Sequence, residues 1–150
     1  GKERTEQVLD IFMKEIIEPM INIYILRVLH KHYEAGDTLL LASATNSILV
    51  NKIGARLEFK NIIGTDPEIN EGNITGKILG VPAIGEGKLK KVKSWMNENG
   101  KVDFSKTTFY SDSINDLPLL LEVEVPIAVN PDNMLREEAI KQGWKIIDLI

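Results

Sequence analysis

Two aspartates, Asp112 and Asp116, stand four residues apart where an apolar stretch ends, in the segment TTFYSDSINDLPLL. If that stretch is a strand, the turn after it places Asp112 at the edge of a sheet and Asp116 near the start of the next helix. Two carboxylates held close together repel each other unless a cation lies between them or one is protonated. Mg²⁺ prefers oxygen ligands of this kind. The ordinary alternative, a turn residue followed by an acid in the first turn of a helix, is equally compatible with the spacing.

Lys88 is a second candidate, because it follows the loop Gly85-Glu86-Gly87 at the start of a predicted helix. A cation there opposes the helix dipole, so its presence needs another reason, and neutralising a phosphoryl oxygen would be one. The alternative is a solvated side chain, since lysines also occupy positions 90, 91 and 93. The glycines do not form a Walker A loop, which would need glycine in place of Pro82.

A third candidate is the run Ser43-Ala44-Thr45-Asn46, which ends an apolar stretch and precedes a predicted helix. Backbone N–H groups and the helix dipole favour an anion at such a place, so these residues are candidates for binding phosphate. The alternative is that Ser43, Thr45 or Asn46 only caps the helix.

The hydrophobic pattern predicts the elements that must position these residues. Strands are predicted over residues 38–45, 59–65, 107–110, 125–129 and 144–149, helices over 4–17, 20–35, 46–57, 86–98, 115–122 and 133–141, and a hairpin within 68–80. Pro19 is expected to separate the first two helices. Alternation of strands and helices indicates an α/β fold with a parallel sheet covered on both faces. Ligands bind such sheets beyond the carboxyl ends of the strands.

Composition narrows the class of protein. The chain has 150 residues, 43% hydrophobic and 27% charged, which is typical of one globular domain. Its net charge is −4, which argues against a nucleic-acid-binding protein. No apolar run approaches the roughly 20 residues of a membrane span, and the polar start does not resemble a secretory leader. With no cysteine, the composition predicts a cytoplasmic enzyme without disulfides.

In their order along the chain, these segments resemble motifs II, III and IV of the haloacid dehalogenase superfamily of phosphatases, and most of all its phosphoserine-phosphatase-like branch. The resemblance runs through LLLASATNSILVNKIGARLEF, NITGKILGVPAIGEGK and FYSDSINDLPLLLEVEVPIAVNPD, and covers nearly the whole chain from about Ile17. It implies a three-layer, Rossmann-like parallel sheet. Residues 1–17 would be the end of a helical cap, and residues 18–150 a single core domain lacking its first strand.

The resemblance also implies roles in the hydrolysis of a small phosphorylated metabolite with Mg²⁺. Ser43 would hydrogen-bond the phosphoryl group, with Ala44, Thr45 and Asn46 completing that binding segment. Lys88 would offset negative charge on the phosphoryl group and the nucleophile. Asp112 would bind Mg²⁺, and Asp116 would support either the metal or Lys88.

The family's nucleophile is the first aspartate of a D-x-D-x-[TV] motif, and it forms an aspartyl-phosphate. No such motif occurs here. Seven acids precede Ser43, none of them at the end of an apolar strand: Glu3, Glu6, Asp10, Glu15, Glu18, Glu34 and Asp37. The expectation is a phosphatase core that is inactive alone. The alternative is a non-catalytic binding or interaction module on the same scaffold.

The strand that carries this motif in the family lies between the strand ending at Ser43 and the strand ending at Ser111. Without it, two inner strands would each present an edge of unpaired backbone groups. Two outcomes are expected: either the two half-sheets pair directly, or another copy of the chain contributes a strand and forms a homodimer.

Overall fold

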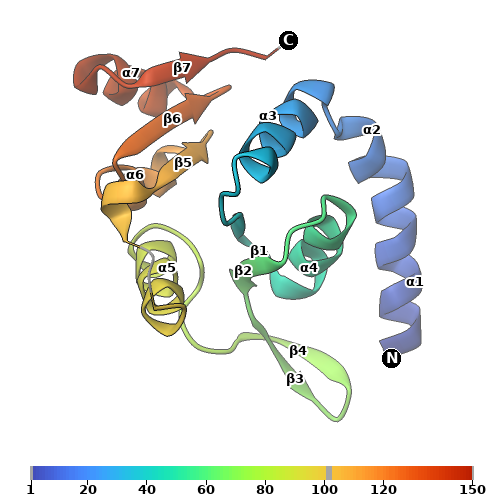
Figure 1. Ribbon diagram of the computed structural model, residues 1–150. Helices are drawn as coiled ribbons and strands as arrows, with labels where there is room; N and C mark the ends of the chain where they lie inside the picture. The colour runs from blue at the N-terminus through green and yellow to red at the C-terminus, as the bar shows by residue number, and fades with distance from the viewer. Residues whose placement is uncertain (1, 101–102, 150) are drawn as a thin grey trace. The chain divides into compact units, whose positions relative to one another are not determined.

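The computed structural model describes residues 2–100 and 103–149 (Figure 1). The chain divides into two compact units, Gly1–Pro82 and Ala83–Ile150. Each unit has its own parallel sheet, so the fold is mixed α/β, as the alternating pattern predicted. Among the described helices, none combines the length and apolar character that crossing a bilayer requires.

The first unit begins with a run of helices: α1 (Lys2–Phe12), a π-helical turn (Met13–Ile17), α2 (Glu18–Met20) and α3 (Ile23–Glu34). The prediction of a break at Pro19 was wrong by two residues. Proline occupies the first turn of α2, and the helical run continues through it from the preceding π-helical turn. The chain turns instead at Ile21 and Asn22, where Asn22 Oδ1 accepts the N–H of Tyr24 at 2.7 Å and begins α3.

The parallel pair of the first unit consists of β1 (Leu40–Asn46) and β2 (Asn61–Thr65), joined by α4 (Ser47–Arg56). Helix α4 packs against both strands. A glycine at position 54 allows this close approach, because a Cβ there would lie 2.3 Å from Ile62 Cδ1.

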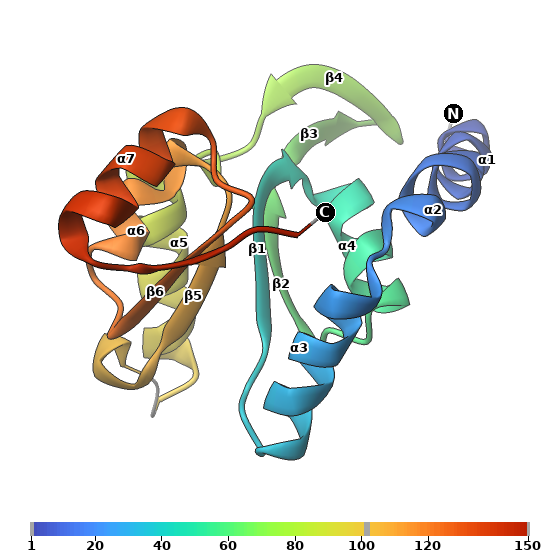
Figure 2. The ribbon, with the colours of Figure 1, turned by 90° about the horizontal axis from the view of Figure 1, so that it is seen from above.

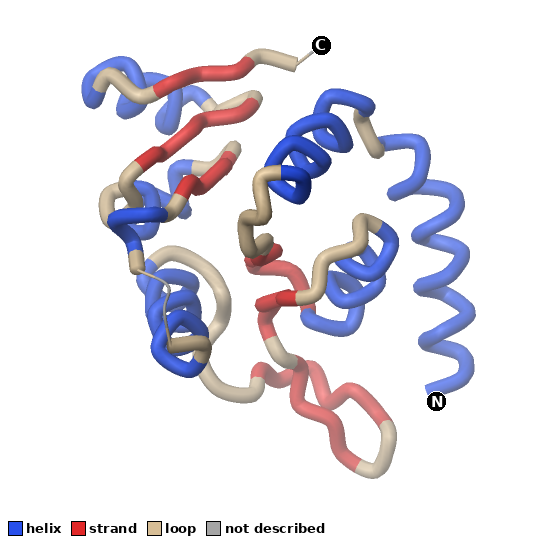
Figure 3. Tube along the Cα trace, viewed as in Figure 1, coloured by secondary structure: helices blue, strands red, loops and turns tan. Residues whose placement is uncertain are grey.

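Two ion pairs join the N-terminal helices to α4, beside which α1 runs in Figure 1. Lys52 Nζ lies 2.9 Å from Asp10 Oδ1, and Arg56 makes a bidentate contact with Glu18. The same unit contains the predicted hairpin, formed by β3 (Pro67–Asn70) and β4 (Asn73–Ile78) and visible as paired red segments in Figure 3.

The second unit contains three parallel strands in the order β5 (Thr108–Ser111), β6 (Val125–Val129) and β7 (Lys145–Ile147). Its helices are α5 (Glu86–Glu98), α6 (Leu117–Leu120) and α7 (Asn133–Gln142), and α7 packs against β6 and β7 (Figure 2). The core of this unit joins helices and sheet through Leu120, Ala128, Leu135 and Ala139, with Phe109, Ile114, Trp144 and Ile146 packed around them.

The predicted elements of this unit are present, and most of the differences are shifts of one or two residues at their ends. Helix α5 and strand β6 have the predicted bounds. The helix predicted over residues 115–122 is divided into a 3₁₀ turn, Ile114–Asp116, and the short α6. A further 3₁₀ turn at Phe104–Lys106 was not predicted.

The two parallel sheets, β1–β2 and β5–β6–β7, are separate in the part of the chain that the structure describes. Strand β1 pairs with β2 alone, and β5 pairs with β6 alone. Whether the two half-sheets pair directly stays a prediction, because they belong to different units of the chain. Strands β1 and β5 are each an edge strand of their own sheet among the described residues.

Candidate active site

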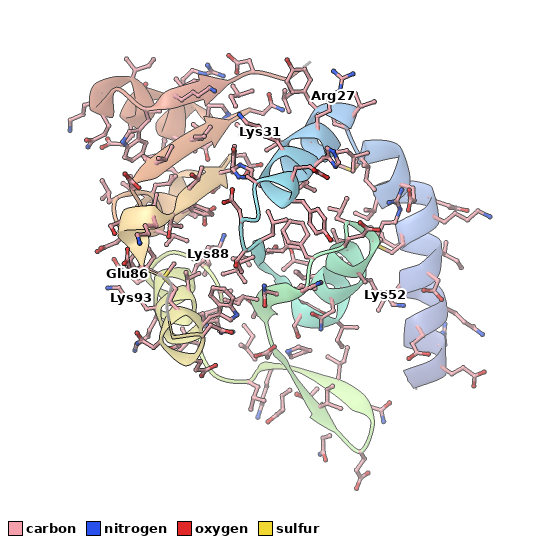
Figure 4. The ribbon with its side chains drawn as sticks, in the orientation of Figure 1. Arg27, Lys31, Lys52, Glu86, Lys88 and Lys93 are labelled. Carbon is pink, nitrogen blue, oxygen red and sulfur yellow. The ribbon has the colours of Figure 1, made fainter. Side chains whose placement is uncertain are left out.

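Lys88 lies in the first turn of α5, near its label in Figure 4. The preceding helix cap is Gly85, whose φ of 55° and ψ of −127° are readily adopted only by glycine. Lys88 is only 6% exposed, and its Nζ donates a hydrogen bond to Asp116 Oδ1 at 2.6 Å. The alternative of a solvated lysine is therefore wrong for this residue.

Asp116, the acceptor, ends the 3₁₀ turn that follows β5 and is 7% exposed. Its second oxygen, Oδ2, accepts the hydroxyl proton of Ser111 at 2.6 Å. Both carboxylate oxygens therefore have donors. A buried ion pair needs such extra hydrogen bonds, because desolvation of the two charges otherwise cancels much of their attraction.

Ser111 is a residue of the site that sequence reasoning did not single out. It ends β5, is 7% exposed and accepts the N–H of Ser113 at 3.1 Å while donating to Asp116. The sequence signal that could have identified Ser111 is a small hydroxyl residue at the end of an apolar strand, close to two aspartates. Ser111 thus joins the strand end to the carboxylate that holds Lys88.

Asp112 stands in a different environment from Asp116. It immediately follows β5 and is exposed, and its side chain has no hydrogen-bond or ion-pair partner among the described residues. The four-residue spacing therefore does not give the two acids equal roles. Asp116 is committed to Lys88 and Ser111, whereas the carboxylate of Asp112 is available at the carboxyl end of the strand.

The predicted phosphate-binding segment belongs to the first unit, where it ends β1 and begins α4. Asn46 Oδ1 accepts the N–H groups of Ile48 and Leu49, at 2.8 and 3.4 Å, so the capping interpretation is confirmed for this residue. Ser43 Oγ accepts the N–H of Thr45 at 3.2 Å. Ser43 is half-buried, and Ala44, Thr45 and Asn46 are exposed.

Strand β2 supports this segment from the neighbouring position in the sheet. Thr65 Oγ1 donates to the carbonyl oxygen of Ala44 at 2.7 Å. At Gly64, a Cβ would lie 2.8 Å from Ser47 Cα, so only glycine allows β2 to approach the start of α4 this closely. The turn from β1 into α4 is thereby fixed by its neighbours.

The donor set for a divalent cation is incomplete. No group of three or more histidine, aspartate or glutamate residues able to hold a metal occurs within residues 2–100 and 103–149. Asp112 offers the hard oxygen donor that Mg²⁺ prefers, but both oxygens of Asp116 are already engaged. The residues present thus fit one ligand of a magnesium site and a buried lysine beside it.

Comparison with known proteins gives a match over most of the chain. A family model described as haloacid dehalogenase-like hydrolase matches residues 2–121. A histidinol-phosphatase from Neisseria meningitidis is 40% identical over 140 residues, covering 91% of this chain and 63% of that protein. A phosphoserine phosphatase from Mycobacterium tuberculosis is 38% identical over 117 residues, covering 78% of this chain and 38% of that protein. The chain thus spans less than two thirds of the length of these relatives.

Solved structures give the same picture of the fold. The crystal structure of a protein with unknown function from Bordetella pertussis Tohama I matches with a TM-score of 0.95 and 39% identity. That match covers 100% of this chain and 68% of the other. A probable phosphoserine phosphatase from Vibrio cholerae has a TM-score of 0.64 at 17% identity, covering 74% of this chain and 34% of the other, which is a similarity of fold alone.

Proposed function

Because the chain belongs to the haloacid dehalogenase-like hydrolases, in the phosphoserine-phosphatase-like branch, we propose that it carries the phosphate-holding part of a phosphatase site. Its fold is the Rossmann-like α/β core of that family. The proposed reaction of the whole protein is the Mg²⁺-dependent hydrolysis of a small phosphomonoester in the cytoplasm. The observation that supports this most is the buried Lys88–Asp116 pair next to the uncommitted carboxylate of Asp112.

In this proposal Lys88 binds the phosphoryl group. A lysine ammonium has three N–H donors, and Asp116 accepts one of them at 2.6 Å. The remaining donors would bind phosphoryl oxygens, while Asp116 holds the ammonium group in place. Asp116 therefore fits the role of holding Lys88 better than that of a direct metal ligand. Ser43 and the N–H groups around Thr45 are proposed as a phosphate-binding segment of the first unit.

Asp112 would be the ligand for Mg²⁺ in this part of the site. When bound, the ion would offset the negative charge of the phosphoryl oxygens as a Lewis acid. The exposed position of Asp112 after β5 leaves room for the water molecules that Mg²⁺ keeps in its coordination shell.

The nucleophile is the part of the chemistry that these 150 residues do not supply. The covalent route of the family requires a D-x-D-x-[TV] motif, and the sequence contains none. We therefore propose that the chain alone binds phosphate without turnover. The names of its relatives suggest histidinol phosphate and phosphoserine as representatives of the substrate class.

A phosphate titration followed by amide NMR tests the binding part of the proposal. The amides of residues 43–46 and 87–88 should shift first, and Lys88→Met should weaken the response. Lys93→Met is the matched control, because Lys93 is an exposed lysine of the same helix. Shifts confined to other residues, as a non-catalytic module without a phosphate site would give, would count against the proposal.

An activity assay tests the second part. Purified chain with millimolar Mg²⁺ should not release phosphate from phosphoserine, histidinol phosphate or p-nitrophenyl phosphate. Asp112→Asn serves as the control for contaminating phosphatases. If the wild-type chain released phosphate and Asp112→Asn did not, the chain would contain a nucleophile, and the prediction that it is inactive alone would be wrong.

A further inference from the structure

Asp132 is the N-cap residue of α7, and one of its carboxylate oxygens caps the helix in the usual way. Its Oδ1 accepts the N–H of Leu135 at 2.8 Å. An aspartate is among the preferred residues at this position, and its negative charge also interacts favourably with the helix dipole. A cap of this kind needs only one side-chain oxygen.

The rest of Asp132 contacts the loop that carries the two acids of the candidate site. Its second oxygen, Oδ2, accepts the N–H of Ile114 at 2.9 Å. Its own backbone N–H donates to the carbonyl oxygen of Asp112, also at 2.9 Å. Asp132 therefore binds the main chain of this loop on both sides of Ser113, in addition to capping α7.

We propose that Asp132 is a positioning residue, which fixes the backbone of Asp112–Ile114 and thereby the direction in which Asp112 presents its carboxylate. The inference rests on the proposed function, since it assigns Asp132 to the same site. The Asp112 side chain has no partner among the described residues, so only the position of its backbone limits where its carboxylate can reach. Asp116, by contrast, is also held by Lys88 and Ser111.

This difference predicts an unequal effect of losing Asp132. The hydrogen bond from Ile114 to a carboxylate is charge-assisted and stronger than a neutral one. Without it, the loop between Ser111 and Asp116 loses its anchor at Ile114, while the bond from the Asp132 N–H to the Asp112 carbonyl oxygen and the Lys88–Asp116 pair remain. Cation binding at Asp112 should therefore weaken while the ion pair remains.

Asp132→Ser separates the cap of α7 from the contact with Ile114. Serine caps helices about as well as aspartate, so the Leu135 N–H keeps an acceptor. Its single short hydroxyl cannot reach Ile114 at the same time. Asp132→Ala removes both contacts. Asp103→Ser is the matched control, because Asp103 caps a 3₁₀ turn of the same unit by accepting the N–H of Ser105.

Two measurements on the whole chain decide the proposal. Amide hydrogen exchange at Ile114 should become about fivefold faster in Asp132→Ser, corresponding to the loss of one modest hydrogen bond, while exchange at Leu135 is unchanged. With Mn²⁺ alone as the probe, paramagnetic broadening of the Asp112 and Ser113 amides should require about tenfold more metal, as is usual when a residue behind a ligand is lost.

Each other outcome overturns the proposal in a recognisable way. Unchanged exchange at Ile114 would show that the contact is not formed in solution. Faster exchange with an unchanged Mn²⁺ response would show a structural role only. A wild-type chain whose residues 112–113 do not respond to Mn²⁺ would defeat the metal assignment of Asp112, and the positioning role with it. The Asp103→Ser control should behave as wild type in both measurements.

Discussion

Replacing Lys88 by methionine tests whether the ion pair at the centre of the site is buried in solution as it is in the structure. Methionine keeps an unbranched side chain of similar length, so the packing of the lysine methylenes is largely preserved. What is lost is the ammonium group that lies 2.6 Å from Asp116 Oδ1. The side chains of the pair are only 7% and 10% exposed, so water cannot replace the lost partner.

The expected cost follows from this burial. Removing one partner of a buried ion pair typically destabilises a protein by about 3–5 kcal/mol, because a charge is left without compensation. The Ser111 hydroxyl still donates to the other oxygen of Asp116, so the lower end of the range, about 3 kcal/mol, applies. Combining Lys88→Met with Asp116→Leu removes both charges and should restore most of the stability.

Urea unfolding followed by tryptophan fluorescence is a suitable assay, because both tryptophans, Trp95 and Trp144, lie in the second unit. The control is Arg136→Met, which breaks a pair with Asp148 whose side chains are 39% and 59% exposed. An exposed pair contributes about 0–1 kcal/mol. A loss in Lys88→Met no larger than in this control would refute the reasoning, since the pair would then be solvated.

Three further predictions concern metal, pH and assembly. Calorimetry should show Mg²⁺ binding no tighter than about millimolar, because Asp112 is the one uncommitted acid of the site, and micromolar affinity would contradict this. A hydrogen bond from Arg136 lowers the pKa of Asp148 from 3.8, so this carboxylate stabilises the fold above that pH. Stability should fall as the pH drops through the lower, folded-state pKa, and an equally steep acid loss in Asp148→Asn would argue against it. Sedimentation should show a dimer, because β1 and β5 each keep an unpaired edge among the described strands, whereas a stable monomer would exclude strand exchange between copies.

The elements that could be predicted from sequence are those whose signals are local. Helix α5 and strand β6 have the predicted bounds, because a glycine precedes a strongly periodic segment in one case and an apolar run is enclosed by charged and polar residues in the other. The break after α2 was misplaced for a local reason as well. The proline pattern places the boundary at Pro19, whereas Asn22, which caps α3, determines where the next helix begins.

The role of Lys88 could not be obtained from local signals. It stands among exposed or half-buried lysines, and a charged residue in an amphipathic helix ordinarily faces solvent. Its burial depends on an acceptor 28 residues further along the chain. Its place at a helix start made it a candidate, but only the resemblance to a phosphatase family favoured this over a solvated side chain. The structure supplies the physical reason for its burial, a carboxylate that itself receives a second hydrogen bond.

The contact between Asp132 and Ile114 follows from the topology of the sheet and not from a local sequence signal. As a helix cap Asp132 is visible in the sequence, but its contact with Ile114 joins residues 18 positions apart. That contact follows from β5 and β6 being parallel neighbours in which Ser111 pairs with Ala128. The chain leaves both strands at the same edge of the sheet, so the loop after β6 meets the loop after β5. In a parallel sheet, the residues that hold a site in place are therefore to be sought just after the neighbouring strand, even when that segment carries no catalytic motif.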